Sequence, residues 1–168
     1  MLREREGRGE PQAGPLPARL GREVRVEHPL DGRSDIGGLE PVDVRGNAAA
    51  DVSHMMAELL ENATTFSPPS APVSVIGKYA HDGYLLSITD NGIGMTAKEL
   101  RDANERLSQA GKFDTSPLMV LGLFVVSRLA LRHGIQVRLA ESPAEGVTAK
   151  VKLPLELLEG ANPEQFDV

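Results

Sequence analysis

Cysteine is absent from the 168-residue sequence, and basic residues are fewer than acidic ones. The absence of cysteine excludes a disulfide framework and a thiolate metal site, and it suits a reducing compartment. With 18 Lys and Arg against 24 Asp and Glu, the formal charge is -6. A nucleic-acid partner is therefore not expected, because phosphate backbones are held mainly by clustered basic side chains.

Long apolar runs are missing as well. A membrane-spanning helix needs ~20 consecutive apolar residues, and the longest candidate, residues 118–131, is interrupted by Ser127 and Arg128. Residues 1–21 carry charge but lack the continuous apolar segment of a signal peptide. We therefore expect a cytoplasmic protein without direct membrane insertion.

The length fits one domain with its own core. Residues 1–20 mix charged residues with Gly and Pro, which predicts a flexible N-terminal arm. Residues 21–155 form the expected domain, and residues 156–168 the expected C-terminal tail, which begins with a short helical turn.

Apolar periodicity predicts alternating strands and helices along the domain. Asn47 is the expected N-cap of the first helix, Thr96 and Glu99 a capping box at the second, and Gly134 the end of the third. Strands paired as hairpins with helices between them predict a two-layer α/β sandwich, with a mixed, largely antiparallel sheet covered by helices on one face. Expected strands are 22–28, 41–46, 72–80, 83–90, 135–142 and 146–154; expected helices are 48–66, 96–108 and 118–132.

The helix over residues 48–66 carries an apolar stripe and a polar line. His54, Glu58 and Asn62 are four residues apart and so share one helix face. Such a line is usually a solvated face, but Asn62 falls in the last turn before Pro68, where its oxygen could reach a ligand such as Mg²⁺. A carboxylate one turn earlier could orient or deprotonate a water. The stripe comprises Ala48, Val52, Met55, Leu59, Ala63 and Phe66.

Two glycine-containing segments are further candidates. In TDNGIGM, Asp90 ends a strand, and Gly92 and Gly94 allow close backbone approach or positive φ; the alternative is a simple turn. In VLGLFVVSRLA, Gly122 lies near a helix start, where free backbone N–H groups can bind phosphate. The alternative there is a buried helix with Gly122 at a close-packing contact.

Together these segments resemble the ATP-binding domain of the gyrase, heat-shock chaperone, histidine kinase and mismatch-repair superfamily, which has the Bergerat fold. The nearest likeness is to catalytic domains of actinobacterial sensor histidine kinases, and it spans residues 21–154. ELLENATTFSPP is similar to the N box of the family, DNGIGM to its G1 box, LGLFVVSRLA to the end of its G2 box, and GVTAKVKLP to its closing strand.

The resemblance implies a role for each matching residue. Asn62 would bind the Mg²⁺ that bridges the ATP phosphates, and Glu58 occupies the position of a catalytic carboxylate. Asp90 would accept a hydrogen bond from the adenine amino group. The other implied nucleotide-binding residues are Gly92 and Gly94, which shape the pocket, Met95 beside the base, Gly122 and Leu123 in the G2 box, and Thr148, which supports adenine through a water.

The sequence departs from the family pattern at two places. Residues 118–120 replace the further glycines of the G2 box, and Thr65 replaces a phosphate-binding Lys of the N box. Either change could weaken nucleotide affinity. Cations between Met95 and Pro117 are candidates to compensate: Lys98, Arg101 and Lys112.

The resulting hypothesis is an ATP-binding, histidine-kinase-like catalytic domain that binds Mg-ATP for phosphoryl transfer to a partner protein in signal transduction. The partner would carry the phosphoacceptor or be a response regulator, because none of the four histidines is expected on a preceding helical hairpin. The alternatives are an anti-sigma-factor-type serine kinase and a degenerate nucleotide-binding interaction module; a gyrase-like hydrolase is less favoured. The histidines are His28, His54, His81 and His133.

Overall fold

The computed structural model describes residues 34–35, 38–109, 118–143 and 145–160. Their elements follow in the order β1 (Ser34–Asp35), α2 (Gly46–Phe66), β2 (Val73–Ala80), β3 (Gly83–Thr89), α3 (Ala97–Ser108), α4 (Leu118–His133), β4 (Gln136–Glu141), β5 (Val147–Pro154) and the 3₁₀ turn η1 (Leu155–Leu157). The predicted arm 1–20 and the predicted strand 22–28 lie outside the described residues.

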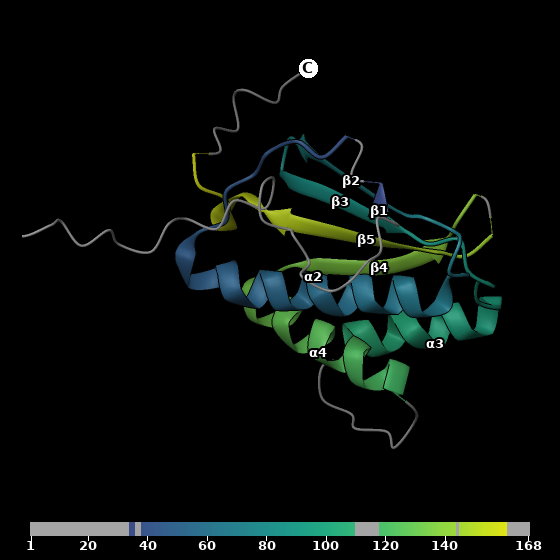
Figure 1. Cartoon of the computed structure of the whole chain (residues 1–168). Helices are drawn as coiled ribbons and strands as arrows, with labels where there is room; N and C mark the ends of the chain where they lie inside the picture. Colours follow the sequence, from purple (N-terminus) through teal and green to yellow (C-terminus); the bar gives the residue numbers. More distant parts are fainter. Residues whose placement is uncertain (1–33, 36–37, 110–117, 144, 161–168) are drawn as a thin grey trace, which may run out of the picture.

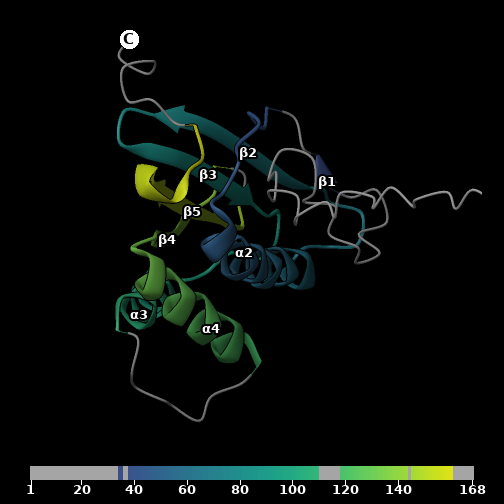
Figure 2. The ribbon, with the colours of Figure 1, turned by 90° about the vertical axis from the view of Figure 1, so that its left-hand side faces the viewer.

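The strands form one sheet in the order β1-β2-β3-β5-β4. β1 pairs with β2 in parallel, and the other neighbours are antiparallel. Helices α2, α3 and α4 all lie on one face of this sheet (Figures 1 and 2). The predicted two-layer sandwich with a largely antiparallel sheet is confirmed.

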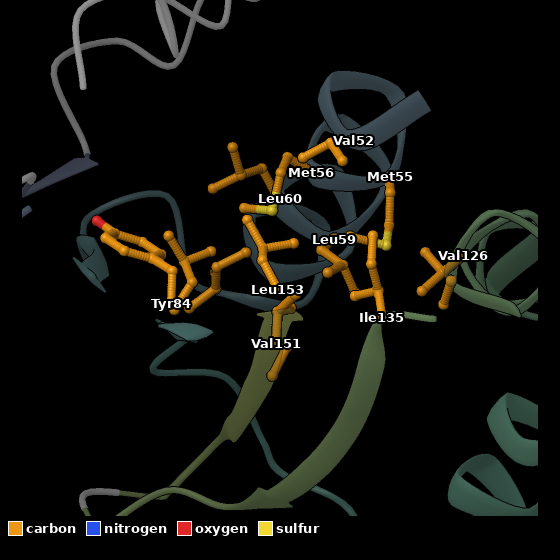
Figure 3. Close-up of a cluster of buried hydrophobic side chains, with 14 of the residues drawn as sticks. Val52, Met55, Met56, Leu59, Leu60, Tyr84, Val126, Ile135, Val151 and Leu153 are labelled. Atoms are coloured by element: carbon orange, nitrogen blue, oxygen red, sulfur yellow. The ribbon is translucent and has the colours of Figure 1, made fainter. Parts of the chain in front are cut away.

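The core lies between the helices and the sheet. Along β3 and β5, alternate side chains point toward the helices and are buried, as the period of two of a strand requires. Burying one such apolar side chain stabilises the fold by roughly 1.5–3 kcal/mol. Figure 3 shows side chains of α2 facing those of the sheet and of α4; those labelled include Met55, Leu59, Tyr84, Val126, Val151 and Leu153.

The predicted apolar stripe of α2 is buried except at its last position. Phe66 is 40% exposed because the helix ends there, immediately before Ser67 and Pro68. Its side chain does not enter the core and instead lines a cavity between the helices and the sheet. The prediction of Phe66 as a core residue was therefore wrong.

Two further local predictions were wrong. Residues 41–46 form no strand: Val44 makes an isolated bridge to Leu158 and is buried in the core. Asn47 is not the N-cap of α2, because the helix already begins at Gly46 and its cap residue is Arg45, whose side chain makes no capping bond. Helix ends are defined only to within one or two residues, whereas the pairing of Val44 depends on Leu158, which is distant in the sequence.

The other helix ends follow the sequence. Thr96 and Glu99 form the predicted capping box at the start of α3, in which the Thr96 hydroxyl accepts from the Glu99 backbone N–H. Gly134 has φ +65° directly after α4, the conformation that ends many helices. Both predicted hairpins, β2–β3 and β4–β5, are present.

Candidate functional site

A cavity of about 430 Å³ opens between the helices and one end of the sheet. This volume is in the range of ~300–1,000 Å³ typical of small-molecule sites. Its lining comes from segments far apart in the sequence: Leu59, Asn62, Ala63 and Phe66 of α2, Ile88, Asp90, Ile93, Gly94 and Met95 around the end of β3, Glu99, Asp102, Ala103 and Arg106 of α3, Leu123 of α4, Leu139 of β4, and Val147 and Ala149 of β5.

Asp90 follows β3 directly, and its carboxylate is held in place by the next strand. Its Oδ1 accepts hydrogen bonds from the backbone N–H of Gly92 at 2.9 Å and of Val147 at 3.0 Å. Its own N–H donates to the Val147 carbonyl. Both of these bonds are made to Oδ1, and neither is made to Oδ2. Asp90 is buried, and it lines the cavity. A buried carboxylate oriented in this way presents an acceptor to a ligand.

Glycines allow the backbone to close around Asp90. A Cβ atom at Gly92 would lie 2.4 Å from the Phe66 carbonyl oxygen, which brings the loop against the end of α2. A Cβ at Gly146, where φ is +89°, would lie 2.4 Å from the Asp90 carbonyl oxygen. Of the two predicted glycines, Gly94 lines the cavity, whereas Gly92 supports it by packing behind Asp90.

Glu58 and Asn62 meet α4 at Gly122. A Cβ placed at Gly122 would be 3.1 Å from Glu58 Oε2 and 3.4 Å from Asn62 Nδ2. The two side chains on α2 therefore converge on one backbone position of α4, where an added Cβ would require them to shift. His54 Nε2 lies 3.2 Å from Glu58 Oε1 at the outer end of the same line. Asn62 lines the cavity, with Glu58 one helical turn away.

The donor set suits a divalent cation held jointly with a ligand. Within the described ranges, no group of three or more His, Asp or Glu side chains could hold a metal ion by itself. Mg²⁺ commonly takes one or two protein oxygens and completes its shell with phosphates and waters. The amide of Asn62 and the carboxylate of Glu58 fit that pattern.

Comparison with known proteins assigns the family. Residues 47–157, more than half of the chain, match the family described as histidine kinase-, DNA gyrase B-, and HSP90-like ATPase. The chain belongs to this family. This ATPase domain has no helix, among the residues described, with the length and hydropathy needed to cross a membrane.

Its relatives include sensor histidine kinases and another sensor protein. The signal transduction histidine-protein kinase/phosphatase MprB of Mycolicibacterium paratuberculosis is 30% identical over 99 residues, 58% of this chain and 19% of MprB. The sensor protein KdpD of Rathayibacter rathayi is 30% identical over 154 residues, 86% of this chain and 18% of KdpD. The ATPase domain thus spans about a fifth of the length of these curated relatives.

Solved structures agree with the fold. A mycobacterial sensor histidine kinase MprB superposes with a TM-score of 0.59 at 27% identity, covering 73% of this chain and 80% of that chain. The ATP-binding domain of PrrB from Mycobacterium tuberculosis gives 0.55 at 22% identity, covering 72% and 78%, and supports the fold alone. The resemblance to the ATP-binding catalytic domain of sensor histidine kinases is confirmed, and the anti-sigma-factor alternative is not favoured.

The placement of Thr148 differs from the prediction. Val147 and Ala149 line the cavity of the ATPase domain, so Thr148, between them on β5, points to the opposite face of the sheet. There its hydroxyl lies 3.1 Å from that of Thr89. Thr148 therefore does not face the cavity, and Val147 occupies the place proposed for it.

Helix α3 forms a wall of the site that the sequence motifs did not indicate. Glu99, Asp102 and Arg106 recur at spacings of three and four and line the cavity, whereas Lys98 and Arg101 do not. Helical periodicity was the available signal. Lys98 instead donates to Asp102 at 2.7 Å and holds the pKa of that carboxyl below its usual range. Lys112 lies outside the described residues.

Side chains fix α3 against the rest of the ATPase domain. The Asn104 amide donates to the Leu139 carbonyl at 2.9 Å and accepts from the Leu139 N–H at 2.8 Å, as a neighbouring strand would. The buried Ser127 hydroxyl of α4 donates to the Leu107 carbonyl at 3.0 Å. These bonds hold the α3 wall at the outer edge of β4.

Proposed function

We propose that this ATPase domain binds Mg-ATP in the cavity and presents the γ-phosphate to a partner protein of a two-component system in the cytoplasm. The observation that carries the proposal is that Asp90 and Asn62 line one cavity, with Glu58 beside Asn62. The phosphoacceptor would be a histidine of a partner or of another part of a longer kinase.

The adenine would bind at the Asp90 end. The Asp90 carboxylate, fixed by two backbone N–H groups, is suited to accept a bond from the exocyclic amino group of a purine. Apolar side chains surround this end and would pack against the base: Ile88, Met95, Leu123, Leu139, Val147 and Ala149. Burial of a planar apolar base between such side chains is favourable, and the single carboxylate would select adenine.

The triphosphate would extend toward Asn62. Asn62 would hold Mg²⁺ together with phosphate oxygens, and Glu58 would hold the metal-bound end in place and polarise the acceptor. Bound Mg²⁺ would neutralise charge that develops on the phosphates during transfer. Gly122 and Leu123 would border this part of the site from α4, but as the fifth and sixth residues of that helix they do not carry the free N–H groups of a helix start.

Calorimetric titration with ATP tests this proposal. The wild-type domain should bind ATP more tightly with Mg²⁺ than with EDTA, and Asn62→Ala should remove that difference while leaving metal-free binding unchanged. Glu61→Ala is the matched control, because Glu61 is the exposed neighbour of Asn62 on α2. No binding by the wild-type domain, or an equal Mg²⁺ effect in Asn62→Ala, would refute the proposed site.

A further inference from the structure

The sheet face opposite the helices carries positive charge on an otherwise acidic molecule. On β2 to β5, side chains that alternate with the buried ones point to this open face. Among these positions are four of the ten Lys and Arg of the described residues, and no Asp or Glu, although Asp35 of β1 pairs with Ser74 at the edge of the sheet. The residues that define the open face are Ile76, Lys78, Leu85, Arg138, Lys150 and Lys152.

The register of the strands gathers these cations. Arg138 on β4 lies directly opposite Lys150 on β5, and neither has an acid beside it on the open face. Like charges directly opposite each other in an antiparallel pair destabilise it. Lys152 alone is paired in the described part of the face, with Asp82 of the β2–β3 turn. This arrangement works against folding stability and so indicates a binding role.

Apolar side chains lie among the cations. Ile76 is 49% exposed and Leu85 is 36% exposed. Ile76 pairs with Ser87 on β3, so Leu85, two residues from Ser87, is its diagonal neighbour on the same face. Lys78 pairs directly with Leu85, and Leu85 with Lys152. The centre of the open face is thus apolar, and its flanks are positively charged.

We infer that the open face docks an acidic protein segment in which carboxylates flank an apolar side chain. The carboxylates would pair with Lys78, Arg138 and Lys150, and the apolar side chain would cover Ile76 and Leu85. Charge complementarity of this kind guides encounter and orientation. A nucleic acid fits less well, because its phosphate backbone carries no apolar side chain that would cover Ile76 and Leu85. The inference does not depend on ATP binding.

A peptide titration tests this docking surface. The probe is a fluorescent twelve-residue peptide of Glu with central Leu and Phe, and the comparison peptide carries Gln for each Glu. The acidic peptide should bind with a Kd of roughly 1 mM or tighter at low ionic strength, and more weakly in salt. Arg138→Glu with Lys150→Glu should weaken binding by about tenfold or more.

The matched control is Arg45→Glu with Arg128→Glu, which changes net charge equally at exposed positions away from the open face. It should keep the peptide affinity within about twofold. Arg138→Glu alone should bind the peptide more weakly but melt no lower than wild type, because it replaces a like-charge pair by an opposite one.

Several results would overturn the inference. They are no binding of the acidic peptide, equal binding of the Gln peptide, and equal loss in the control variant. Tighter binding of a DNA duplex or of phosphatidylserine vesicles through Arg138 and Lys150 would also overturn it, in favour of that polyanion.

Discussion

Asn62, in the last turn of α2, and Asp90, directly after β3, line the same cavity although they belong to different layers of the fold. The sheet places Asp90 through its bonds to Gly92 and Val147, and the helix places Asn62 against Gly122 of α4. A purine carrying a metal-bound triphosphate needs two such ends.

Replacing Asp90 by Asn should weaken ATP binding while the fold is kept. Asparagine retains an oxygen for the N–H groups of Gly92 and Val147 but turns an NH₂ group toward the ligand. Loss of a hydrogen bond to a charged group is worth about 1.5–3 kcal/mol, so affinity should fall roughly ten- to a hundredfold by calorimetry. Unchanged affinity, with unchanged melting temperature, would place the adenine elsewhere.

Alanine at Gly146 should destabilise the protein more than alanine at Gly134. Both glycines have positive φ, but only a Cβ at Gly146 would collide, 2.5 Å from Asp90 Oδ1. Backbone strain alone should cost about 1–2 kcal/mol at Gly134, whereas Gly146→Ala should exceed that by 1 kcal/mol or more, by a rough estimate for forced overlap. Urea unfolding gives the free energy of unfolding of both variants. Equal decreases would show that Asp90 moves away from the added Cβ at little energetic cost.

Gly122→Ala should lower the affinity for Mg-ATP while leaving the free energy of unfolding nearly unchanged. Alanine favours helix by about 1 kcal/mol over glycine, which roughly offsets the cost of moving the neighbouring side chains, so the free energy of unfolding should change by less than about 1 kcal/mol. Its Cβ would press on Glu58 and Asn62, and moving such side chains off their rotamers costs about 0.5–1.5 kcal/mol. Mg-ATP affinity should therefore fall roughly two- to tenfold. Wild-type affinity in a stable variant would contradict the convergence of these residues at the ligand.

Asn104→Leu should loosen α3 from the sheet. The substitution removes both bonds to Leu139 and leaves its backbone groups without these partners, at a cost of about 1–3 kcal/mol. Hydrogen exchange should speed up at the Leu139 amide and along α3. Ser108→Ala, an exposed position on the same helix, is the control. If Leu139 stayed as protected as in wild type, another contact would be holding α3.

Acid should weaken the attachment of α2 to the end of α4. Hydrogen bonds from His133 at 2.7 Å and from Arg132 at 2.9 Å hold the pKa of Asp51 below its ordinary 3.8. The unfolded chain then binds the proton first, so this stabilisation is complete above about pH 3.8 and is lost as pH falls through the folded pKa. The difference in unfolding free energy between wild type and Asp51→Asn should shrink over that range; a constant difference would exclude the linkage.

Local patterns in the sequence predicted both hairpins and the capping box of α3, because each depends on residues close together in the chain. The sandwich followed from the order of the predicted strands and helices. The convergence of Glu58, Asn62 and Gly122 followed from helical spacing together with family motifs. The prediction that Thr148 faces the nucleotide was off by one position. A shift of one residue along a strand moves the side chain to the other face of the sheet. The α3 wall was not predicted. Helical spacing places Glu99, Asp102 and Arg106 near one another, but tertiary contacts such as those of Asn104 set the direction in which they point.

Phe66 and the 41–46 segment show a related limit. Periodicity assigned both to regular buried structure, but what surrounds the end of a helix or a short extended segment is set by distant parts of the chain. The open sheet face was likewise not predicted, because only the strand register shows that Arg138 lies opposite Lys150.

An amide chemical-shift titration with Mg-ATP tests the central claim most directly. The account predicts that the largest shifts fall at Gly94, Met95 and Val147 around Asp90, and at Asn62 and Gly122 near the phosphates. Saturable shifts confined to other parts of the molecule, or none at all, would contradict a nucleotide site in this cavity.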